Sequence, residues 1–201
     1  MIKPDRRTQR TRKNIVDAYV RITSKRTNEL ITVTEVAREA DINRSTFYLH
    51  FKDVADLHEA IENEVFSNLL NIVCSNNLED IKRDSLPLFI ELFTYFDRHS
   101  EILVILLDIH GSITANRRLG KVIEQKLQTE WRSIIPYGED RENGYYVSFM
   151  INGVIGVLQS WIETGKQETP RDLASSVKSM IDWGLSHGGS RIRESEPKRF
   201  S

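Results

Sequence analysis

The stretch TVTEVAREADINRSTFYLHFK, residues 32–52, decides the fold because capping residues mark the start of two short helices. Thr32 and Glu35 have the Ser/Thr-x-x-Glu spacing of a capping box, in which each side chain satisfies a free backbone N–H at a helix start. Apolar residues then recur at i, i+3, i+4 and i+7, which is one buried face of a helix: Val33, Val36, Ala37 and Ala40. A first helix is therefore expected over residues 32–40.

A tight turn and a second helix are expected next. Asp41 tolerates the left-handed backbone of a tight turn, and Asn43 is a good N-cap for the following helix. In the helix predicted over 44–52, Phe47 and Phe51 form the large apolar pair at helical spacing and are expected to face the core. At about 100° per residue, the positions that point away are Ser45, Tyr48, Leu49 and Lys52, with Arg44 and His50 on the flanks.

This outward surface suits a DNA groove. Arginine can fork onto a guanine edge, leucine can touch a thymine methyl group, and tyrosine, histidine and lysine can hold phosphates. An ordinary pair of surface helices would also carry a polar face, so these residues alone leave both interpretations open.

The run TFYLHFK at 46–52, preceded by ITVTEVAREA at 31–40, closely resembles the helix-turn-helix of the TetR (tetracycline-repressor-like) family of bacterial transcription regulators, which usually reads TFYxHF. Asp41 stands where that family commonly has glycine, and Val54 stands where a second lysine often contacts the DNA backbone. The resemblance and the basic N-terminal end of the first helix together imply these DNA contacts: Thr34, Arg44, Ser45, Tyr48, Leu49, His50, Lys52, Arg10 and Lys13.

Charge is divided unevenly along the chain. Residues 1–52 contain 12 Lys or Arg and 6 Asp or Glu, net +6, which leaves 16 basic and 23 acidic residues, net −7, for the rest. Only the N-terminal part is electropositive, as expected if this part alone lies on phosphates.

Features of export and of membrane insertion are missing from the sequence. Cys74 is the only cysteine, so no intrachain disulfide can form. No apolar stretch follows the basic N-terminus, which argues against a secretory signal, and the longest aliphatic run, 102–107, is too short to span a membrane. A cytoplasmic protein without a membrane partner is expected.

Helical periodicity continues beyond residue 53 and predicts an all-α chain of about nine helices. Residues 102–107 could form a buried strand by periodicity alone, but a helix capped by Ser100 is expected because no partner strand is evident. The expected domains are a three-helix helix-turn-helix domain at 1–53, a helical bundle at 54–189 and a disordered tail at 190–201. Further helices are expected at 53–74, 86–98, 119–134, 142–164 and 170–187, the last one ended by Gly188 and Gly189.

The second domain resembles, less specifically, the effector-binding domain of the same family, whose last two helices usually form a four-helix dimer interface. The resemblance implies a homodimer through Gly153, Val157, Leu173, Val177 and Ile181, although packing within one subunit would explain Gly153 equally well. It also implies a pocket for an unidentified small molecule. The residues expected to line this pocket are Phe89, Phe93, Phe96, His110, Trp131, Phe149 and Trp161. These aromatic residues and this histidine could equally belong to an ordinary core.

No enzyme class is indicated. The sequence lacks a phosphate-binding Gly-Lys-Ser/Thr loop, a Gly-x-Ser-x-Gly elbow and a His-Glu-x-x-His pair. Asp97, His99, Asp108 and His110 could converge on a zinc ion, but their spacing is not a known signature, so neither a metal nor a cofactor is expected.

The sequence therefore predicts a ligand-responsive transcription regulator, a repressor, that binds a palindromic double-stranded DNA operator as a dimer. The alternative is a TetR-like interaction protein that lacks specific operator binding and acts by pairing with another regulator or enzyme. Val54 favours the alternative slightly, whereas the intact outward surface and the basic N-terminal part favour DNA.

Overall fold

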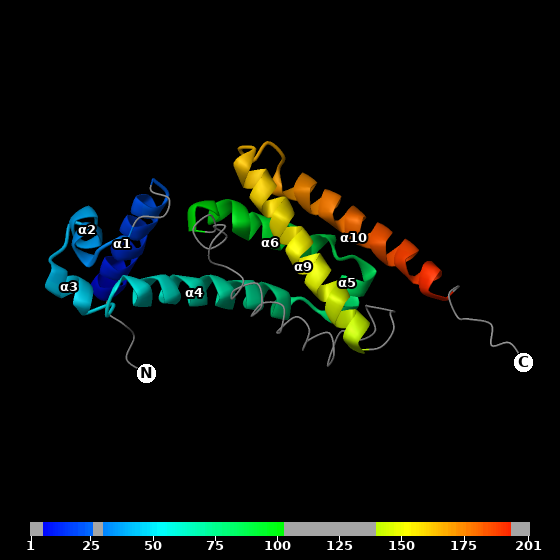
Figure 1. Cartoon of the computed structure of the whole chain (residues 1–201), viewed down its shortest axis with the longest axis horizontal. Helices are drawn as coiled ribbons and strands as arrows, with labels where there is room; N and C mark the ends of the chain where they lie inside the picture. Colours follow the sequence, from blue (N-terminus) through cyan, green and yellow to red (C-terminus); the bar gives the residue numbers. More distant parts are fainter. Residues whose placement is uncertain (1–5, 26–29, 103–139, 194–201) are drawn as a thin grey trace, which may run out of the picture. The chain divides into compact units, whose positions relative to one another are not determined.

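The computed structural model describes residues 6–25, 30–102 and 140–193. Within these ranges the chain is all helical, with eight helices and no strand, which confirms the predicted fold class (Figure 1). In chain order the helices are α1 (Arg6–Thr23), α2 (Val33–Glu39), α3 (Arg44–Tyr48), α4 (Val54–Ser75), α5 (Leu78–Arg83), α6 (Leu86–Arg98), α9 (Asp140–Glu163) and α10 (Pro170–Arg193). The helix expected over 119–134, and most of the one expected over 102–107, lie outside the described residues.

The chain divides into two compact units, and the division falls inside α4, between Asn68 and Leu69. The first part of α4 belongs with α1, α2 and α3, because Leu57 and Ile61 are buried in the core that these helices share. The sequence-based boundary at 53/54 marks the start of α4 instead. None of the described helices combines the length and the apolarity that crossing a membrane requires.

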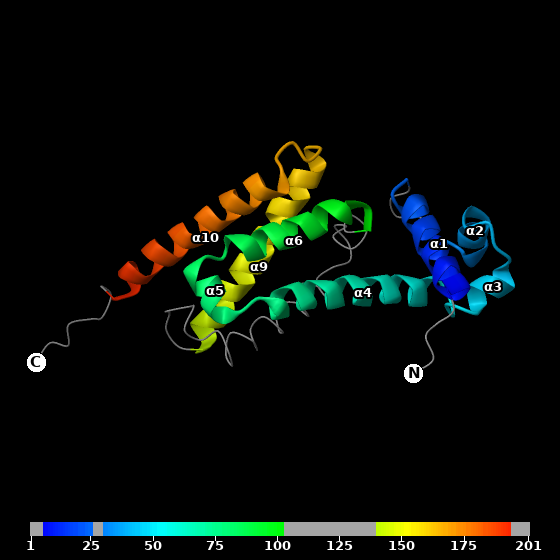
Figure 2. The ribbon, with the colours of Figure 1, turned by 180° about the vertical axis from the view of Figure 1, so that it is seen from behind.

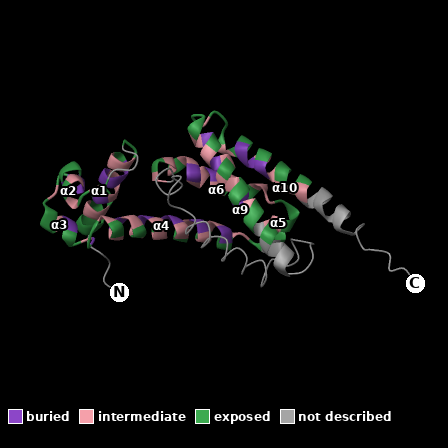
Figure 3. Cartoon of the chain, viewed as in Figure 1, coloured by how far each residue is buried: buried purple, intermediate pink, exposed green. Residues whose placement is uncertain are grey.

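The core of the first unit is built from the apolar stripes that the sequence displays (Figure 3). It joins residues from α1, α2, the α3 region and α4: Ile15, Ala18, Tyr19, Val36, Ala40, Phe47, Phe51, Leu57 and Ile61. Ile102 packs against the same cluster from a distant part of the sequence. The helix-turn-helix stretch is therefore held on its inner side by two longer helices.

In the second unit, α6 packs along α10, as the reverse view makes plain (Figure 2). Helices α6, α9 and α10 each have a buried side, whose residues include Leu88, Phe93, Phe96, Leu158, Trp161, Leu173 and Val177. The α9–α10 turn uses left-handed backbone at Gly165 and Lys166, with φ of 82° and 55°. Lys166 Nζ reaches Asp97 Oδ1 at 2.9 Å and so fastens this turn to the end of α6.

Two helix ends differ from expectation. The helix predicted over 44–52 ends at Tyr48, because the chain tightens with a bond from His50 N to Phe47 O and the Lys52 amide bonds to the first turn of α4. Helix α10 continues past Gly188 and Gly189 to Arg193, since a helical glycine costs only about 1 kcal/mol and no proline follows at once. The disordered tail predicted from residue 190 is therefore wrong for 190–193.

A short helix was also missed. Helix α5 is too short to show an apolar stripe and is specified by polar residues instead. Asn77 Oδ1 accepts a hydrogen bond from Glu79 N at 3.0 Å, and ion pairs join Glu79 to Lys82 and Asp80 to Arg83. Pairs at this spacing stabilise a helix by about 0.2–0.5 kcal/mol each.

Candidate nucleic-acid interface

The start of α2 has the predicted capping box. Thr32 Oγ1 accepts a hydrogen bond from Glu35 N at 3.3 Å, and Glu35 Oε2 accepts one from Thr32 N at 2.9 Å. Val36 and Ala37 on the opposite side of the helix are buried. The box and this apolar contact fix where α2 begins and which side of it faces inward, which leaves Thr34 exposed as predicted.

The turn after α2 is a Schellman motif with Asp41 at its left-handed position, where φ is 53°. Asp41 N donates to Arg38 O at 3.2 Å, and Ile42 N donates to Ala37 O at 3.0 Å. Aspartate adopts this backbone at lower cost than most residues, which is why it can replace the usual glycine. The turn reverses the chain within two residues and sets the direction of α3.

A capping residue fixes the start of α3, and two aromatic rings fix its inner side. Asn43 Oδ1 accepts hydrogen bonds from the backbone and the side chain of Ser45, both at 3.1 Å. Phe47 is completely buried, and its ring centroid lies 5.8 Å from that of Phe51, which is also buried. This short helix therefore has a fixed rotation about its own axis.

Because the inner side is fixed, five side chains project outward and are exposed: Arg44, Ser45, Tyr48, Leu49 and Lys52. We refer to these five residues as the outer face. Tyr48 is 50% exposed and Leu49 is 84% exposed, so two large partly apolar side chains lie among polar ones. His50, predicted for the same surface, is only half exposed and follows the end of α3.

Lys52 has two separate roles. Its backbone N–H donates to Asp56 Oδ2 at 2.8 Å, while Asp53 Oδ1 accepts from Asp56 N at 2.8 Å. These bonds begin α4 directly after the outer face, and the Lys52 side chain stays exposed.

The basic residues of the first unit fall into two groups. Arg10, Lys13, Arg44 and Lys52 are exposed, and none of them forms an ion pair with another residue in the described part of the chain. Arg12 instead pairs with Glu64 at 3.0 Å and lies over the Phe51 ring, 5.4 Å from its centroid. The first group is thus available to an external anion.

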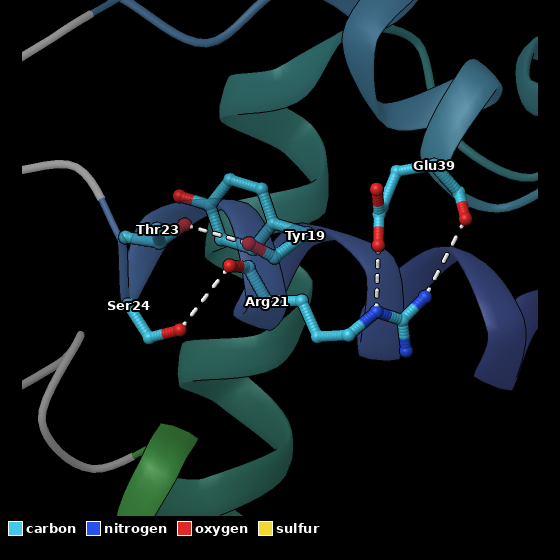
Figure 4. Close-up of polar contacts among 5 residues, drawn as sticks. All are labelled: Tyr19, Arg21, Thr23, Ser24 and Glu39. Carbon is cyan, nitrogen blue, oxygen red and sulfur yellow. Dashed lines mark hydrogen bonds and ion pairs between the residues drawn. The ribbon is translucent and has the colours of Figure 1, made fainter.

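Arg21 belongs with the internally paired group (Figure 4). Its Nε atom lies 2.8 Å from Glu39 Oε1, and this hydrogen bond joins α1 to α2. The bond lowers the pKa of the Glu39 carboxyl below its ordinary value, and the nearby charges of Lys25 and Arg38 act in the same direction. Arg12 and Arg21 therefore serve the fold, and only the structure separates them from the exposed, unpaired group.

Tyr19 connects α1 to α4. Its hydroxyl lies 3.0 Å from His58 Nδ1, and burial raises the pKa of the phenol. Its backbone oxygen accepts a hydrogen bond from Thr23 Oγ1 at 2.8 Å (Figure 4). Together with the Arg12–Glu64 pair, the Tyr19–His58 contact attaches α1 to the first half of α4.

A family model matches the second half of the chain. Residues 83–182 match the model described as "Transcriptional regulator C-terminal region", a TetR-type C-terminal domain. A TetR transcriptional regulator from Streptococcus agalactiae 2603V has the same fold, with a TM-score of 0.59, 20% identity, and coverage of 88% of this chain and 96% of that chain. The chain belongs to the TetR family.

Two further structures share the TetR fold. NalD, the secondary repressor of the MexAB-OprM multidrug efflux pump in Pseudomonas aeruginosa, is 18% identical with a TM-score of 0.66, over 88% of this chain and 98% of that chain. DhaS, a dihydroxyacetone kinase operon activator, is 17% identical with a TM-score of 0.59, over 88% of this chain and 96% of that chain. No curated protein sequence matches the chain. The family is one of DNA-binding transcription regulators, and the outer face lies in the stretch that resembles its helix-turn-helix.

The described members of the predicted effector pocket of this TetR-family regulator differ in exposure. Phe89, Phe93 and Phe96 are buried on α6, and Trp161 is buried on α9 with its Nε1 atom donating to Glu168 O at 3.0 Å. Phe149 is 77% exposed and so does not line an enclosed pocket of one protomer. His110 and Trp131 lie outside the described residues.

The four residues considered as possible zinc ligands lie only partly within the described residues. Asp97 is paired with Lys166, and Asp108 and His110 lie outside the described residues. Among the residues that the structure describes, no group of three or more histidine, cysteine or acidic side chains could hold a metal ion.

The dimer residues predicted for this TetR-family regulator differ in exposure. Leu173 and Val177 are buried within the protomer. Val157 and Ile181 are half exposed, and Gly153 is exposed with open space around it. The large apolar side chains that α9 and α10 do expose are Tyr145, Phe149, Met180 and Trp183.

Proposed function

We propose that this TetR-family regulator binds a palindromic DNA operator as a homodimer, represses transcription there, and releases the operator when a small molecule binds its second unit. The observation that carries the proposal is the outer face. Its five side chains project from a helix whose opposite side is locked by Phe47 and Phe51. Base recognition requires such a fixed presentation, because each good contact to a base edge depends on geometry.

The charges of the first unit support DNA rather than a protein as the partner of this face. Arg44 and Lys52 lie on the face, and Arg10 and Lys13 add exposed charge on α1. Unpaired cations of this kind bind phosphates and release the counterions condensed on DNA, which gives salt-dependent affinity. The net +6 of residues 1–52 has the same sign.

The exposed apolar residues of α9 and α10 support pairing with a second copy. Tyr145 and Phe149 are four residues apart on α9, and Met180 and Trp183 are three apart on α10, so each pair shares one side of its helix. Two recognition helices must be about 34–36 Å apart, or a multiple of this distance, to enter successive major grooves. A dimer thus provides tight binding to a palindrome that one protomer could not achieve.

Helix α4 supports a regulatory link. Residues 54–68 of this continuous helix belong to the first unit and residues 69–75 to the second. A ligand that stabilises a different arrangement of the second unit would act on the outer face through α4. A coupling of about 1–3 kcal/mol would change operator affinity about 5–150-fold.

Both directions of regulation occur among proteins that share this fold. NalD is a repressor and DhaS is an activator, and both share the fold at below 20% identity. The alternative function, an interaction protein without operator binding, rests on Val54. This residue packs against the first core where a second lysine often occurs in the family.

Capture of genomic fragments by the purified full-length chain tests the proposal. We expect retention of a few palindromic fragments, and we expect Arg44→Ala to lose them. Arg171→Ala is the matched control, because it removes an exposed arginine from the second unit. Retention of no fragment, or equal retention by the Arg44→Ala and Arg171→Ala variants, would contradict specific operator binding. A reporter gene placed behind the captured fragment distinguishes repression from activation.

A further inference from the structure

We infer that Leu49 reads the C5 methyl group of a thymine in the major groove of the operator. This inference rests on the proposed DNA binding and names a base feature that one side chain recognises. Leu49 is 84% exposed although it adjoins the fully buried Phe47. In the described part of the first unit, the other exposed large hydrophobic residues are Leu30 and Tyr48.

The neighbours of Leu49 already have contacts within the protein. The Tyr48 ring meets the Phe47 ring edge-on, with centroids 5.8 Å apart and planes at 88°. The Ser45 side chain, one turn before Leu49, donates to Asn43 Oδ1 at 3.1 Å. Leu49 is therefore the apolar member of the outer face whose side chain contributes least to the fold.

The position of Leu49 is nevertheless fixed. It is the C-cap residue of α3, with helical φ of −72° and ψ of −18°, and its N–H donates to Thr46 O at 3.3 Å. Arg44 lies on the same outer face and Lys52 follows three residues later, so polar contacts to DNA on either side would bring Leu49 against the base edges.

The chemistry of the groove then selects the partner. The C5 methyl of thymine is the apolar group that an unmodified base pair presents in the major groove, whereas the other edge features are hydrogen-bond donors and acceptors. A leucine pressed onto those polar features would remove them from water without replacing their hydrogen bonds, which is unfavourable. A leucine pressed onto the methyl buries apolar surface on both partners.

The test uses operator DNA in which the thymines of each half-site are replaced by deoxyuridine, which removes only the C5 methyl group of each base. Burial of one methyl corresponds to about a 4-fold change in affinity. We expect the wild-type protein to bind the deoxyuridine operator about 4-fold more weakly per half-site. Leu49→Ala should bind both operators alike, and Leu49→Met, which keeps an apolar side chain, should retain most of the difference.

Leu30→Ala is the matched control, because Leu30 is 96% exposed and lies outside the outer face. It should keep the full preference for thymine, whereas an effect of deoxyuridine on DNA shape would persist in every variant, including Leu49→Ala. Equal binding of both operators by the wild type, or the same preference in Leu49→Ala and Leu30→Ala, overturns the methyl contact while operator binding stands. Absence of operator binding overturns the proposed function as well.

Discussion

Truncation of Phe149 gives the sharpest test of the proposed dimer, because this large side chain is 77% exposed on α9. A phenylalanine has about 200 Å² of surface to bury, so about 150 Å² would be available to a partner. At about 25 cal/mol per Å², full coverage is worth about 4 kcal/mol per copy. Alanine keeps about a third of that surface, so Phe149→Ala removes about 2.5 kcal/mol per copy.

Two symmetric copies double the effect to about 5 kcal/mol, which corresponds to an increase of about 5,000-fold in the dimer dissociation constant. Coverage of only half of the side chain reduces the expected increase to about 70-fold. Sedimentation velocity over a dilution series measures this constant, with fluorescence detection at nanomolar concentrations. The control is Leu30→Ala, which removes a comparably exposed apolar side chain from the first unit. A change below about 5-fold in Phe149→Ala would refute the assignment of this surface to the dimer.

Three other outcomes are expected. Arg44→Ala should lose about 1–3 kcal/mol of binding free energy on the operator and relax the base preference at one position, and equal losses on random DNA would exclude base reading by Arg44. Lys52→Ala should weaken binding to all sequences alike and reduce the slope of log affinity against log salt concentration by about 1 in anisotropy titrations. Asp41→Ala should lower the free energy of unfolding in urea by about 0.5–1 kcal/mol, while Asp41→Gly should preserve or raise it, because the backbone at Asp41 is left-handed. Similar losses in both variants would mean that the Asp41 side chain matters more than its backbone conformation. A small molecule that quenches Trp161 fluorescence should bind about 5–150-fold more weakly when operator is present, and unchanged affinity would exclude the coupling.

Helix starts could be predicted from the sequence because capping is local. The pairs Thr32 with Glu35 and Thr169 with Asp172 are three residues apart, and both form capping hydrogen bonds. The orientation of Phe47 toward the core followed from helical spacing in the same way. These features depend on neighbours in the chain and need no knowledge of tertiary packing.

The side of a helix that meets a partner could not be predicted in this way. Helix α10 carries apolar residues of both kinds, because Val177 is buried within the protomer and Trp183 is exposed. Sequence periodicity identifies such residues as apolar and does not say which neighbour covers them. The separation of Arg12 and Arg21 from the exposed arginines has the same origin, because their partners Glu64 and Glu39 are distant in sequence.

The way α3 is anchored has a consequence for how the family can diversify. Its fixed points are Asn43, Phe47 and Phe51, whereas the side chains of Arg44 and Leu49 add little to the core. Substitutions at these outward positions are therefore expected to change stability by about 0.5 kcal/mol or less. On the proposed DNA binding, mutation of these positions can explore new target sites without first losing the fold, and the same positions offer a small combinatorial library for redirecting the protein to a chosen sequence.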